Sequence, residues 1–417
     1  MRRALPAMPP PARSPRVPDE TRWQMPKLDE LCGGDLVEAM VREGMIARRA
    51  HPSLPLDIYC YTPRCQAEGV WNAATRACRG LVVDRDSGQV VARPFPKFFT
   101  WGQPQVPTGL TGPVTVADKV DGSLGILVLA DGHDPFLATK ASFTSAQAAH
   151  ATAVYRARYH GAWTPRPGLT YLFEIVYPGN RIVVDYGARD DLILLGAVDI
   201  ATGRSVPLPD LIGDWPGPAA ELFGHASLQE ALAAPPRPNR EGLVVHFTDS
   251  DERIKIKQED YVRLHRLRAL AGPRTVWAHV AVQECRAIAE RDGAPALAAR
   301  LKKIPPDTVR QIVNEPGMLT RLLRDLADPG LTAQVETLAR NLREQAAHWQ
   351  STHRHAFARL NLKDVAERHG RAAAARIVLA EADAALDRQA LFDLLAGRDI
   401  TAHAWRAVYP SPGEDDT

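Results

Sequence analysis

The chain has 417 residues, of which 45% are hydrophobic and 24% are charged, and its formal net charge is +2. This length is sufficient for two or three globular domains with buried cores. The nearly balanced charge means that any phosphate-binding surface must be local. No apolar run approaches the roughly 18 residues that a membrane-spanning helix needs, which argues against a transmembrane protein.

Cysteine usage favours a reducing environment. The five cysteines are odd in number and contain no C-x-x-C pair, so we expect reduced thiols and a cytoplasmic location. Two groups of metal-ligand residue types also lack the spacing of a metal site. They are Cys60, Cys65 and Cys78 in one group, and His348, His353 and His355 in the other.

The N-terminal half of the chain begins with a Pro/Arg-rich tail and a predicted helix at 28–50. Short β-type runs then follow from "LDIYCYT" at residue 56 to about residue 260. The strands predicted after it cover residues 79–84, 89–95, 114–120, 125–130, 170–176, 181–186, 191–200, 242–247 and 253–257.

Helical segments interrupt and follow these strands. One helix is predicted at 145–159, and residues 201–240 should form loops around one short helix, with a Pro-rich break in "APPRPNR". Beyond residue 261, Ala, Leu and Arg recur at helical spacing, which predicts a helical domain. Its clearest helix spans 331–360, where apolar residues recur in steps of three and four.

The stretch "DKVDGSL", residues 118–124, places Lys119 two residues before an Asp-Gly pair, between two β-type runs. An Asp-Gly pair in this setting predicts a β-hairpin. Phosphate-binding patterns of the P-loop and Rossmann type are absent in a strand-to-helix context, and so are two common hydrolase motifs. Whether Lys119 is only a turn residue or a nucleophile therefore depends on its surroundings.

Charged residues occupy several of the predicted strands. Glu174 lies inside an apolar strand, Glu241 stands at the entrance of another, and Lys255 and Lys257 share one strand face by their period-two spacing. Burying such charges unpaired would cost several kcal/mol. They should therefore face one another in a polar cleft or, on edge strands, face solvent.

Cations and aromatic rings are concentrated upstream of Lys119. "CRGLVVD" carries Arg79, and "ARPFPKFFTWGQ" carries Lys97, Phe98 and Phe99. Such a group can hold phosphates while a ring stacks on a base. Together with the two glutamates and the Asp-Gly turn, these residues would form a site for a magnesium-bound nucleoside triphosphate, with one lysine free to attack phosphorus.

Six segments, in this order, resemble the RNA ligase 1 family typified by the T-even bacteriophage enzyme, within the covalent nucleotidyltransferase superfamily. They are "RGLVVD", "RPFPKFF", "KVDGSL", "FEIVYPGNRIVVDY", "EGLVV" and "KIKQEDYVRLH". The resemblance covers roughly residues 60–265. It implies an α+β fold with an antiparallel-sheet, ATP-grasp-like nucleotidyltransferase domain, which would be followed here by an all-α domain.

The resemblance also implies a three-step reaction with ATP and a divalent metal, Mg²⁺ or Mn²⁺. Lys119 would attack the α-phosphorus of ATP, AMP would pass to the 5′-phosphate of an RNA end, and a 3′-hydroxyl would then displace AMP. In these steps Asp121 and Gly122 complete the nucleophile turn, while Lys255 and Lys257 grip the α-phosphate. A broken tRNA is the substrate that the family suggests.

Further roles follow from the same resemblance, position by position. Glu174 and Glu241 match the acidic residues that hold the ribose and the catalytic metal, without indicating which glutamate does which. The cations around the nucleotide would be Arg79 and Lys97, and Phe99 would stack on adenine. Lys140 and Ser142 resemble a family Lys-Gly-Ser segment, but Ala141 replaces its glycine, so this match is weaker. Thr100 stands where the family tends to have asparagine. Tyr261 matches a family tyrosine just beyond the motif lysines.

The predicted domain plan has four parts. Residues 1–25 and 411–417 are expected to be disordered tails, 26–265 the adenylyltransferase domain, and 266–410 a helical module for RNA-substrate specificity. The alternatives within the superfamily are a DNA ligase and a GTP-using capping enzyme, both of which usually carry an OB domain that is not recognisable here. A catalytically inactive RNA-binding module of the same fold is the alternative from another class.

Overall fold

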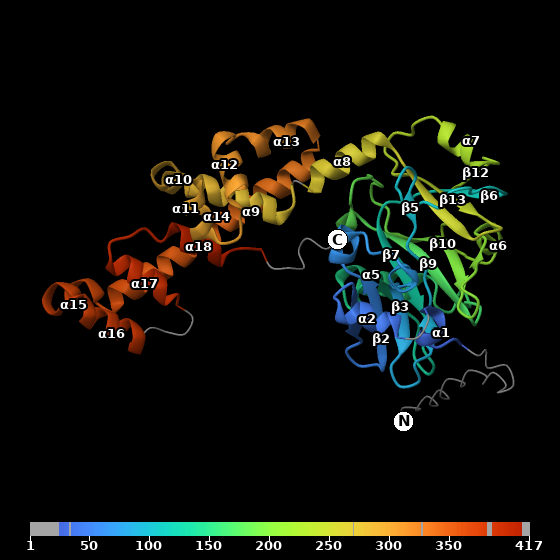
Figure 1. Ribbon diagram of the computed structural model, residues 1–417, viewed down its shortest axis with the longest axis horizontal. Coiled ribbons are helices and arrows are strands. Elements are labelled where there is room, and N and C mark those ends of the chain that lie inside the picture. The colour runs from blue at the N-terminus through green and yellow to red at the C-terminus, as the bar shows by residue number, and fades with distance from the viewer. Residues whose placement is uncertain (1–24, 33–34, 270, 327, 382–385, 411–417) are drawn as a thin grey trace, which may run out of the picture. The chain divides into compact units, whose positions relative to one another are not determined.

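The computed structural model describes residues 25–32, 35–269, 271–326, 328–381 and 386–410 (Figure 1). The chain divides into two compact units, one ending at Lys257 and the other beginning at Gln258. The predicted tails lie outside the described residues, apart from Met25. In the part of the chain that the structure describes, no helix is long and apolar enough to cross a membrane.

Three sheets form the first unit, and antiparallel pairing dominates all of them, as the α+β prediction requires. The first has the order β1-β2-β3-β4, the second β11-β10-β9-β7-β8, and the third β12-β6-β13-β14-β5. Only β14 and β5 pair in parallel among the named strands of the described residues. The strands are β1 (Ile46–Ala50), β2 (Leu56–Tyr61), β3 (Arg79–Asp84), β4 (Val90–Ala92), β5 (Phe99–Thr100), β6 (Val114–Asp118), β7 (Ser123–Val128), β8 (Phe136–Thr139), β9 (Leu169–Val176), β10 (Asp191–Asp199), β11 (Ser205–Val206), β12 (Leu222–Phe223), β13 (Gly242–Phe247) and β14 (Glu252–Lys257).

Short helices connect these strands, and α5 (Ala146–Arg158) is the longest of them. Its start is capped by Ser145, whose side chain accepts a hydrogen bond from the Ala148 N–H. The other helices of this unit are α1 (Leu28–Cys32), α2 (Leu36–Arg42), α3 (Pro63–Glu68), α4 (Ala73–Ala77), η2 (Pro178–Asn180), α6 (Pro209–Ile212) and α7 (Leu228–Ala233).

The second sheet has a hydrophobic core on each face. On one side, Ile126 and Leu172 pack with Ile58 and Val82 of the first sheet. On the other side, Phe173 and its neighbours pack with residues of α5. Strand side chains alternate between faces, so both faces of this sheet are apolar and little of it faces water.

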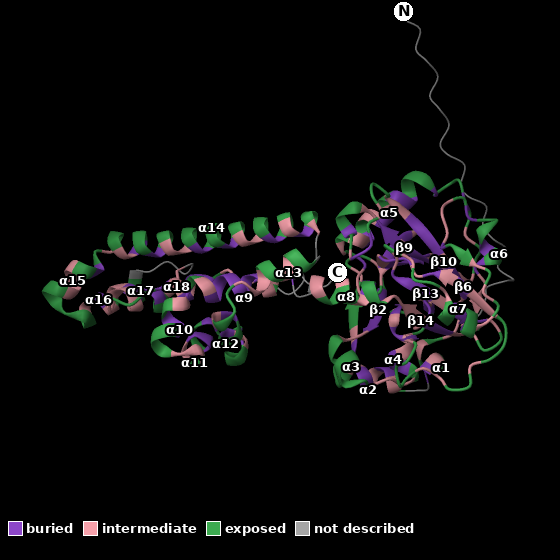
Figure 2. Ribbon diagram, turned by 90° about the horizontal axis from the view of Figure 1, so that it is seen from above, coloured by how far each residue is buried: buried purple, intermediate pink, exposed green. Residues whose placement is uncertain are grey.

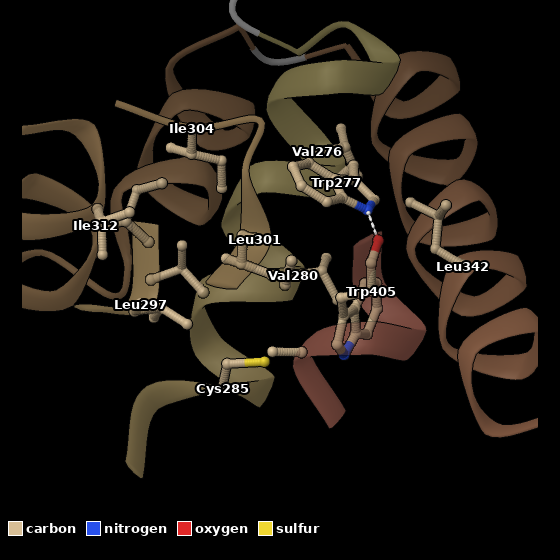
Figure 3. Close-up of a cluster of buried hydrophobic side chains, with 14 of the residues drawn as sticks. Val276, Trp277, Val280, Cys285, Leu297, Leu301, Ile304, Ile312, Leu342 and Trp405 are labelled. Carbon is tan, nitrogen blue, oxygen red and sulfur yellow. Dashed lines mark hydrogen bonds between the residues drawn. The ribbon is translucent and has the colours of Figure 1, made fainter. Parts of the chain in front are cut away.

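The second unit is entirely helical, as predicted, and α14 matches the helix expected at 331–360. The buried residues of α14 lie along one side of the helix (Figure 2). The core of this unit includes Trp277, whose indole N–H donates to the Trp405 carbonyl at 2.8 Å (Figure 3). The helices are α8 (Glu259–Ala269), α9 (Pro273–Glu284), α10 (Arg286–Asp292), α11 (Ala294–Leu301), α12 (Pro306–Asn314), α13 (Met318–Leu326), α14 (Pro329–Arg359), α15 (Leu362–His369), α16 (Arg371–Glu381), α17 (Arg388–Leu395) and α18 (Thr401–Ala407).

Three predicted helix or strand segments are wrong. The helix predicted at 28–50 is instead α1, α2 and β1, because Gly44, at φ 73°, turns the chain after α2 into the first strand. Residues 201–240 contain two short helices and two short strands rather than one helix. The strand predicted at 181–186 does not form, and its backbone donates instead to the carboxylate of Asp121.

Candidate active site

The segment around Lys119 connects two sheets, so the predicted hairpin is wrong. β6 ends at Asp118 and pairs with β12 and β13, whereas β7 begins at Ser123 and pairs with β8 and β9. The Asp-Gly pair does not reverse the chain within one sheet. It carries the chain across from the third sheet to the second, and Lys119 lies at this crossing.

Two backbone contacts explain why Asp and Gly stand at the crossing. The Val183 and Val184 N–H groups both donate to Oδ2 of the buried Asp121, each at 2.8 Å. Gly122 does not have a positive φ, but a Cβ there would lie 2.6 Å from the Ile175 carbonyl oxygen. The glycine is therefore required for close approach to β9 rather than for a turn conformation.

Lys119 is paired with Glu241, which is only 3% exposed. The Lys119 Nζ donates to Oε2 at 2.6 Å, and the Lys257 Nζ lies 3.0 Å from Oε1 of the same carboxylate. Burial alone would raise the pKa of Glu241, but the two ammonium groups outweigh it and hold the pKa below its ordinary value. One ionised carboxylate thus holds two of the predicted lysines.

The remaining predicted cations gather beside this pair. Burial, reinforced by the charge of Arg79, lowers the pKa of Lys97 to about 8. Burial, with Arg79 and Lys119 as the largest neighbouring charges, lowers the pKa of Lys255 well below its ordinary value. Among the residues that the structure describes, Nη1 of Arg79 is buried without a hydrogen-bond partner. The positive charge of this cluster is poorly neutralised by other groups of the protein, so the cluster favours binding of an anion.

Glu174, in strand β9, lies within range of the charge of Lys119. Burial raises its pKa to about 7, and the charges of Lys119 and Arg79 counteract this rise while Glu241 adds to it. Its side chain packs close to Gly122, since a Cβ added there would lie 3.1 Å from the Glu174 Cγ. The charge of Lys119 therefore acts on both predicted glutamates, but the pKa of Glu174 is raised and that of Glu241 is lowered.

The two predicted aromatic residues lie near three of the cations. Phe98 lies beneath the Lys255 Nζ, with its ring centroid 4.7 Å away, and 5.7 Å from the Arg79 guanidinium. Phe99 instead packs edge-on against Trp71, and the Lys97 Nζ lies 5.7 Å from its ring centroid. Phe99, predicted to stack on adenine, is 6% exposed.

The secondary predicted residues lie on other elements than Lys119. Lys140 follows β8, and its Cα is close to Gly80, next to Arg79 in β3. Ser142 belongs to the turn after β8, where its hydroxyl accepts the Thr144 N–H at 3.1 Å. Tyr261 lies in α8 of the second unit, and its ring stacks with His265.

Several residues around the site were missed by sequence reasoning. The Tyr186 hydroxyl accepts the Asp121 N–H at 2.8 Å, and the Lys97 Nζ lies 5.0 Å from the ring centroids of both Tyr61 and Trp71. Arg237 forms a salt bridge with Asp118 at 2.6 Å. Only the adjacency of Asp118 to Lys119 offered a signal, because the other contacts join segments far apart in the chain.

A divalent metal at this site would need ligand atoms from a bound substrate as well as from the protein. Within the described ranges, no group of three or more His, Cys, Asp or Glu side chains is placed to hold a metal ion. Mg²⁺ usually takes one or two carboxylates together with phosphate oxygens. Glu174 and Glu241 supply that number of carboxylates, so the residues present fit a metal that arrives with a polyphosphate.

The arrangement can bind a polyphosphate and present an amine to it. In addition to burial, four neighbouring cations lower the pKa of Lys255, and the charge of Lys119 acts on the pKa values of both Glu174 and Glu241. The four cations are Arg79, Lys97, Lys119 and Lys257. Cations fixed around a phosphoryl group stabilise charge that develops when a nucleophile attacks it. The site is therefore suited to nucleophilic attack on phosphorus by Lys119.

Comparison with known proteins identifies similarity to RNA ligases. Residues 77–211 match the model of an RNA ligase family. No curated protein sequence matches the chain. The matched residues include Lys119 and Glu174, but stop before Glu241 and the lysines of β14.

Solved structures of RNA ligases also resemble the chain. An archaeal ATP-dependent RNA ligase is 15% identical, with a TM-score of 0.41, over 71% of this chain and 80% of that one. The Naegleria gruberi RNA ligase with PPi is 18% identical, with a TM-score of 0.29, over 37% of this chain. A variant of it with ATP and Mn is 16% identical, with a TM-score of 0.30.

The chain spans about half (52%) of the Naegleria ligase chains that it matches. The family match covers the segment that contains the crossing at Lys119 and most of the predicted site residues. The similarity to RNA ligases is thus carried by residues 77–211 of this chain, which match the family model.

Proposed function

We propose that this protein is an ATP-dependent RNA ligase that joins RNA 3′-hydroxyl and 5′-phosphate ends through a lysyl-AMP intermediate. The observation that carries the proposal is the pairing of Lys119 with the buried Glu241 at 2.6 Å, amid cations that include an unsatisfied Nη1 of Arg79 in the described structure. A triphosphate would supply the negative charge that these cations lack. The RNA ligase family match of residues 77–211 supports the same activity.

In the first step, Lys119 Nζ loses a proton, with Glu241 Oε2 as the nearest acceptor, and gives its lone pair to the α-phosphorus of ATP. A phosphorus–nitrogen bond forms, and the bond from the α-phosphorus to pyrophosphate breaks. Pyrophosphate leaves with the electron pair, and Nζ releases a second proton. Lys255 and Lys257 would stabilise charge on the α-phosphate, while Arg79 and Lys97 would hold the rest of the nucleotide.

In the second step, a 5′-phosphate oxygen of RNA attacks the same phosphorus. The phosphorus–nitrogen bond breaks and Lys119 regains a proton, leaving AMP on the RNA end. The 3′-hydroxyl of the other end then attacks the 5′-phosphorus, loses its proton and expels AMP. The product is an ordinary phosphodiester, which fits a role in RNA repair, with a broken tRNA as the proposed substrate.

The remaining roles are proposals of the same kind. Phe99 would stack on adenine, Asp121 and Gly122 would hold the nucleophile in place, and Glu174 with Glu241 would bind the ribose and a divalent metal. That metal, Mg²⁺ or Mn²⁺, would neutralise phosphate charge when bound. The Naegleria relative with ATP and Mn lends support to this pair of ligands.

Other proposals concern the secondary site residues, the helical unit and the cellular location of the protein. Lys140, Ser142 and Tyr261 would assist substrate binding, and the helical unit would act as the RNA-specificity module. All five cysteines, each in the described residues, are buried free thiols, which suits the reducing conditions of a cytoplasm.

The test is RNA joining by the purified full chain. Labelled RNA with 5′-phosphate and 3′-hydroxyl ends should be joined or circularised with ATP and Mg²⁺ or Mn²⁺, and Lys119→Ala should abolish the product. Lys27→Ala, which removes an exposed lysine of the first unit outside the predicted site, is the matched control and should join RNA normally.

The alternatives predict different results in the same assay. Dependence on GTP would indicate a capping-type enzyme, and joining of DNA but not RNA ends would indicate a DNA ligase. RNA binding without nucleotide transfer would indicate an inactive module. Each of these three outcomes contradicts the proposal.

A further inference from the structure

The Pro-rich segment before Glu241 contacts residues that are adjacent in sequence to Lys119 and Glu241. Residues 234–240 connect α7 to β13, and Arg237 within them is only partly exposed. One guanidinium nitrogen, Nη2, donates to Oδ1 of Asp118 at 2.6 Å and to the Gly242 carbonyl at 2.7 Å. Its guanidinium also lies over the Phe223 ring, 4.5 Å from the centroid.

Both acceptors of Arg237 adjoin the central pair of the site. Asp118 directly precedes Lys119, and Gly242 directly follows Glu241. The same Gly242 carbonyl accepts the Lys119 N–H at 3.0 Å. Arg237 therefore connects the side chain of Asp118 with the backbone of Gly242, beside the Lys119–Glu241 contact and at the end of the pairing between β6 and β13.

The Asp118 carboxylate is 7% exposed, and Arg237 is its close charge partner. Arg240 lies farther away, at 4.0 Å from Oδ2, with a side chain 38% exposed. A buried carboxylate that loses its near partner has an unfavourable charge beside the nucleophile. This unfavourable charge would favour a displacement of strand β6.

The same segment also contacts the loop that holds Asp121, on the C-terminal side of Lys119. Asn239, at φ 52°, accepts the Asp185 N–H at 2.8 Å and donates to the Asp185 carbonyl at 2.7 Å. The preceding residues, Val183 and Val184, hold the Asp121 carboxylate. One segment thus supports Asp118 directly and Asp121 through two intermediate residues.

We infer that Arg237 is a positioning residue for the nucleophile: its bridge from Asp118 to the Gly242 carbonyl holds Lys119 against Glu241 in the geometry needed to attack the nucleotide. This inference rests on the proposed nucleotidyl transfer. Arg237 contacts neither reacting atom in this account, so its removal should slow lysyl-AMP formation more than it weakens ATP binding.

The test compares Arg237→Gln with the wild-type full chain and with Arg240→Gln, a matched charge removal from the same segment. Single-turnover formation of protein-bound AMP should be about 100-fold slower in Arg237→Gln, the size expected for a misplaced reacting group. The Kd for ATP should change little. Arg240→Gln should react at close to the wild-type rate, and Arg237→Lys should recover part of the rate because it keeps the charge.

A double mutant separates positioning from general damage. Asp118→Asn should slow the reaction, and Asp118→Asn combined with Arg237→Gln should be no slower than Arg237→Gln alone, because both changes break one bridge. If Arg237→Gln fails to fold, the Arg237→Lys and Asp118→Asn variants still give this comparison. A wild-type rate in Arg237→Gln, or fully additive losses, would overturn the inference.

Amide hydrogen exchange gives a readout that needs no activity. Peptides that contain residues 118–122 should exchange faster in Arg237→Gln than in wild type or Arg240→Gln, because the Lys119 N–H loses a fixed acceptor. If the wild-type protein forms no lysyl-AMP, the proposed function fails, and exchange then decides the inference separately. Unchanged exchange in these peptides would overturn it.

Discussion

Lys97 shows how the local environment of one residue can set a pH dependence. Burial and the neighbouring Arg79 lower the pKa of Lys97 to about 8. Below that pH its ammonium can bind phosphate, and above it a growing fraction is neutral. ATP affinity should therefore fall as pH rises through about 8, whereas an ordinary lysine would keep its charge to about 10.4.

We predict that ATP binds about tenfold more weakly at pH 9.5 than at pH 7, the loss of roughly one charge-assisted contact. The Kd should be measured in a Lys119→Met background, where no covalent intermediate forms. In Lys97→Arg the dependence should disappear, since a guanidinium stays protonated throughout this range. The same pH profile in Lys97→Arg as in the parent would show that another group is responsible.

Glu174 gives the stability of the folded protein a pH dependence. Its pKa is raised from 4.5 to about 7 in the folded protein. The folded state then binds a proton more tightly than the unfolded state, so this group stabilises the fold below about pH 4.5 and the stabilisation is lost as pH rises through 7. At pH 8 the ionised carboxylate is a cost to folding.

Glu174→Gln should accordingly raise the free energy of unfolding at pH 8 by roughly 1–3 kcal/mol relative to wild type, with a much smaller difference at pH 5. Urea unfolding at several pH values measures this difference. Glu68→Gln, at an exposed position of α3, should show no such trend. A Glu174→Gln variant that is less stable than wild type at pH 8 would contradict the assignment.

At the scale of elements, the crossing between β6 and β7 determines where Lys119 lies. The sequence pattern correctly indicated a strand on each side of "KVDG" but not that the strands join different sheets. An Asp-Gly pair has the same local preference in both arrangements. The choice depends on the contacts of Asp121 with Val183 and Val184, which are 62 and 63 residues distant.

Gly122→Ala tests this crossing. A methyl group there would lie 2.6 Å from the Ile175 carbonyl, so β7 and β9 must move apart or the crossing must shift. We expect a loss of about 2–4 kcal/mol in the free energy of unfolding and a marked loss of lysyl-AMP formation. Chemical denaturation and AMP labelling measure the two effects.

Gly224→Ala is the control, because that glycine has open space at the corresponding position and no positive φ. It should leave both stability and labelling near wild type. Equal effects of the two substitutions would argue against close packing at Gly122.

Strand prediction succeeded where the pattern was local. β3 and β13 match the predicted ranges at both ends, and α5 lies within its predicted helix. The 181–186 run failed although it has the composition of a strand. Its N–H groups have a carboxylate to bind, and this partner is not visible in the run itself.

At the scale of the whole molecule, the two units have separate hydrophobic cores. Trp277 and Trp405 belong to a core formed only by residues of the second unit, whereas Phe173 and Leu172 belong to cores of the first. The sequence predicted this division from the change in composition, since helical spacing replaces alternation after residue 261. It gave no means of assigning the helices of the second unit to a known module.

We predict that calorimetry of the full chain resolves two unfolding transitions and that ATP raises only one of them. ATP at 100 times its Kd should stabilise the first unit by about 2.7 kcal/mol. The Lys119→Met background again prevents covalent reaction. A single transition, or an equal shift of both transitions, would show that the units do not unfold independently.

The candidate site could be named residue by residue from the sequence only because separate segments resembled one family in order. The structure brings Lys119, Glu241 and Lys257 into contact. In addition to burial, the charges of Arg79 and Lys97 lower the pKa of Lys255. The charge of Arg79 also counteracts the rise that burial causes in the pKa of Glu174. The bridge through Arg237 could not be predicted, because it depends on the path of a loop without a regular pattern.

The most direct measurement is to identify the residue that carries AMP. The full chain, incubated with α-labelled ATP and Mg²⁺ or Mn²⁺, should acquire one adenylyl group, released by acid as expected for a phosphoramidate. Peptide mapping should place that group on Lys119, and Lys119→Ala should remove it. AMP mapped to another lysine, such as Lys255 or Lys97, or the absence of any adenylylated protein, would contradict the account.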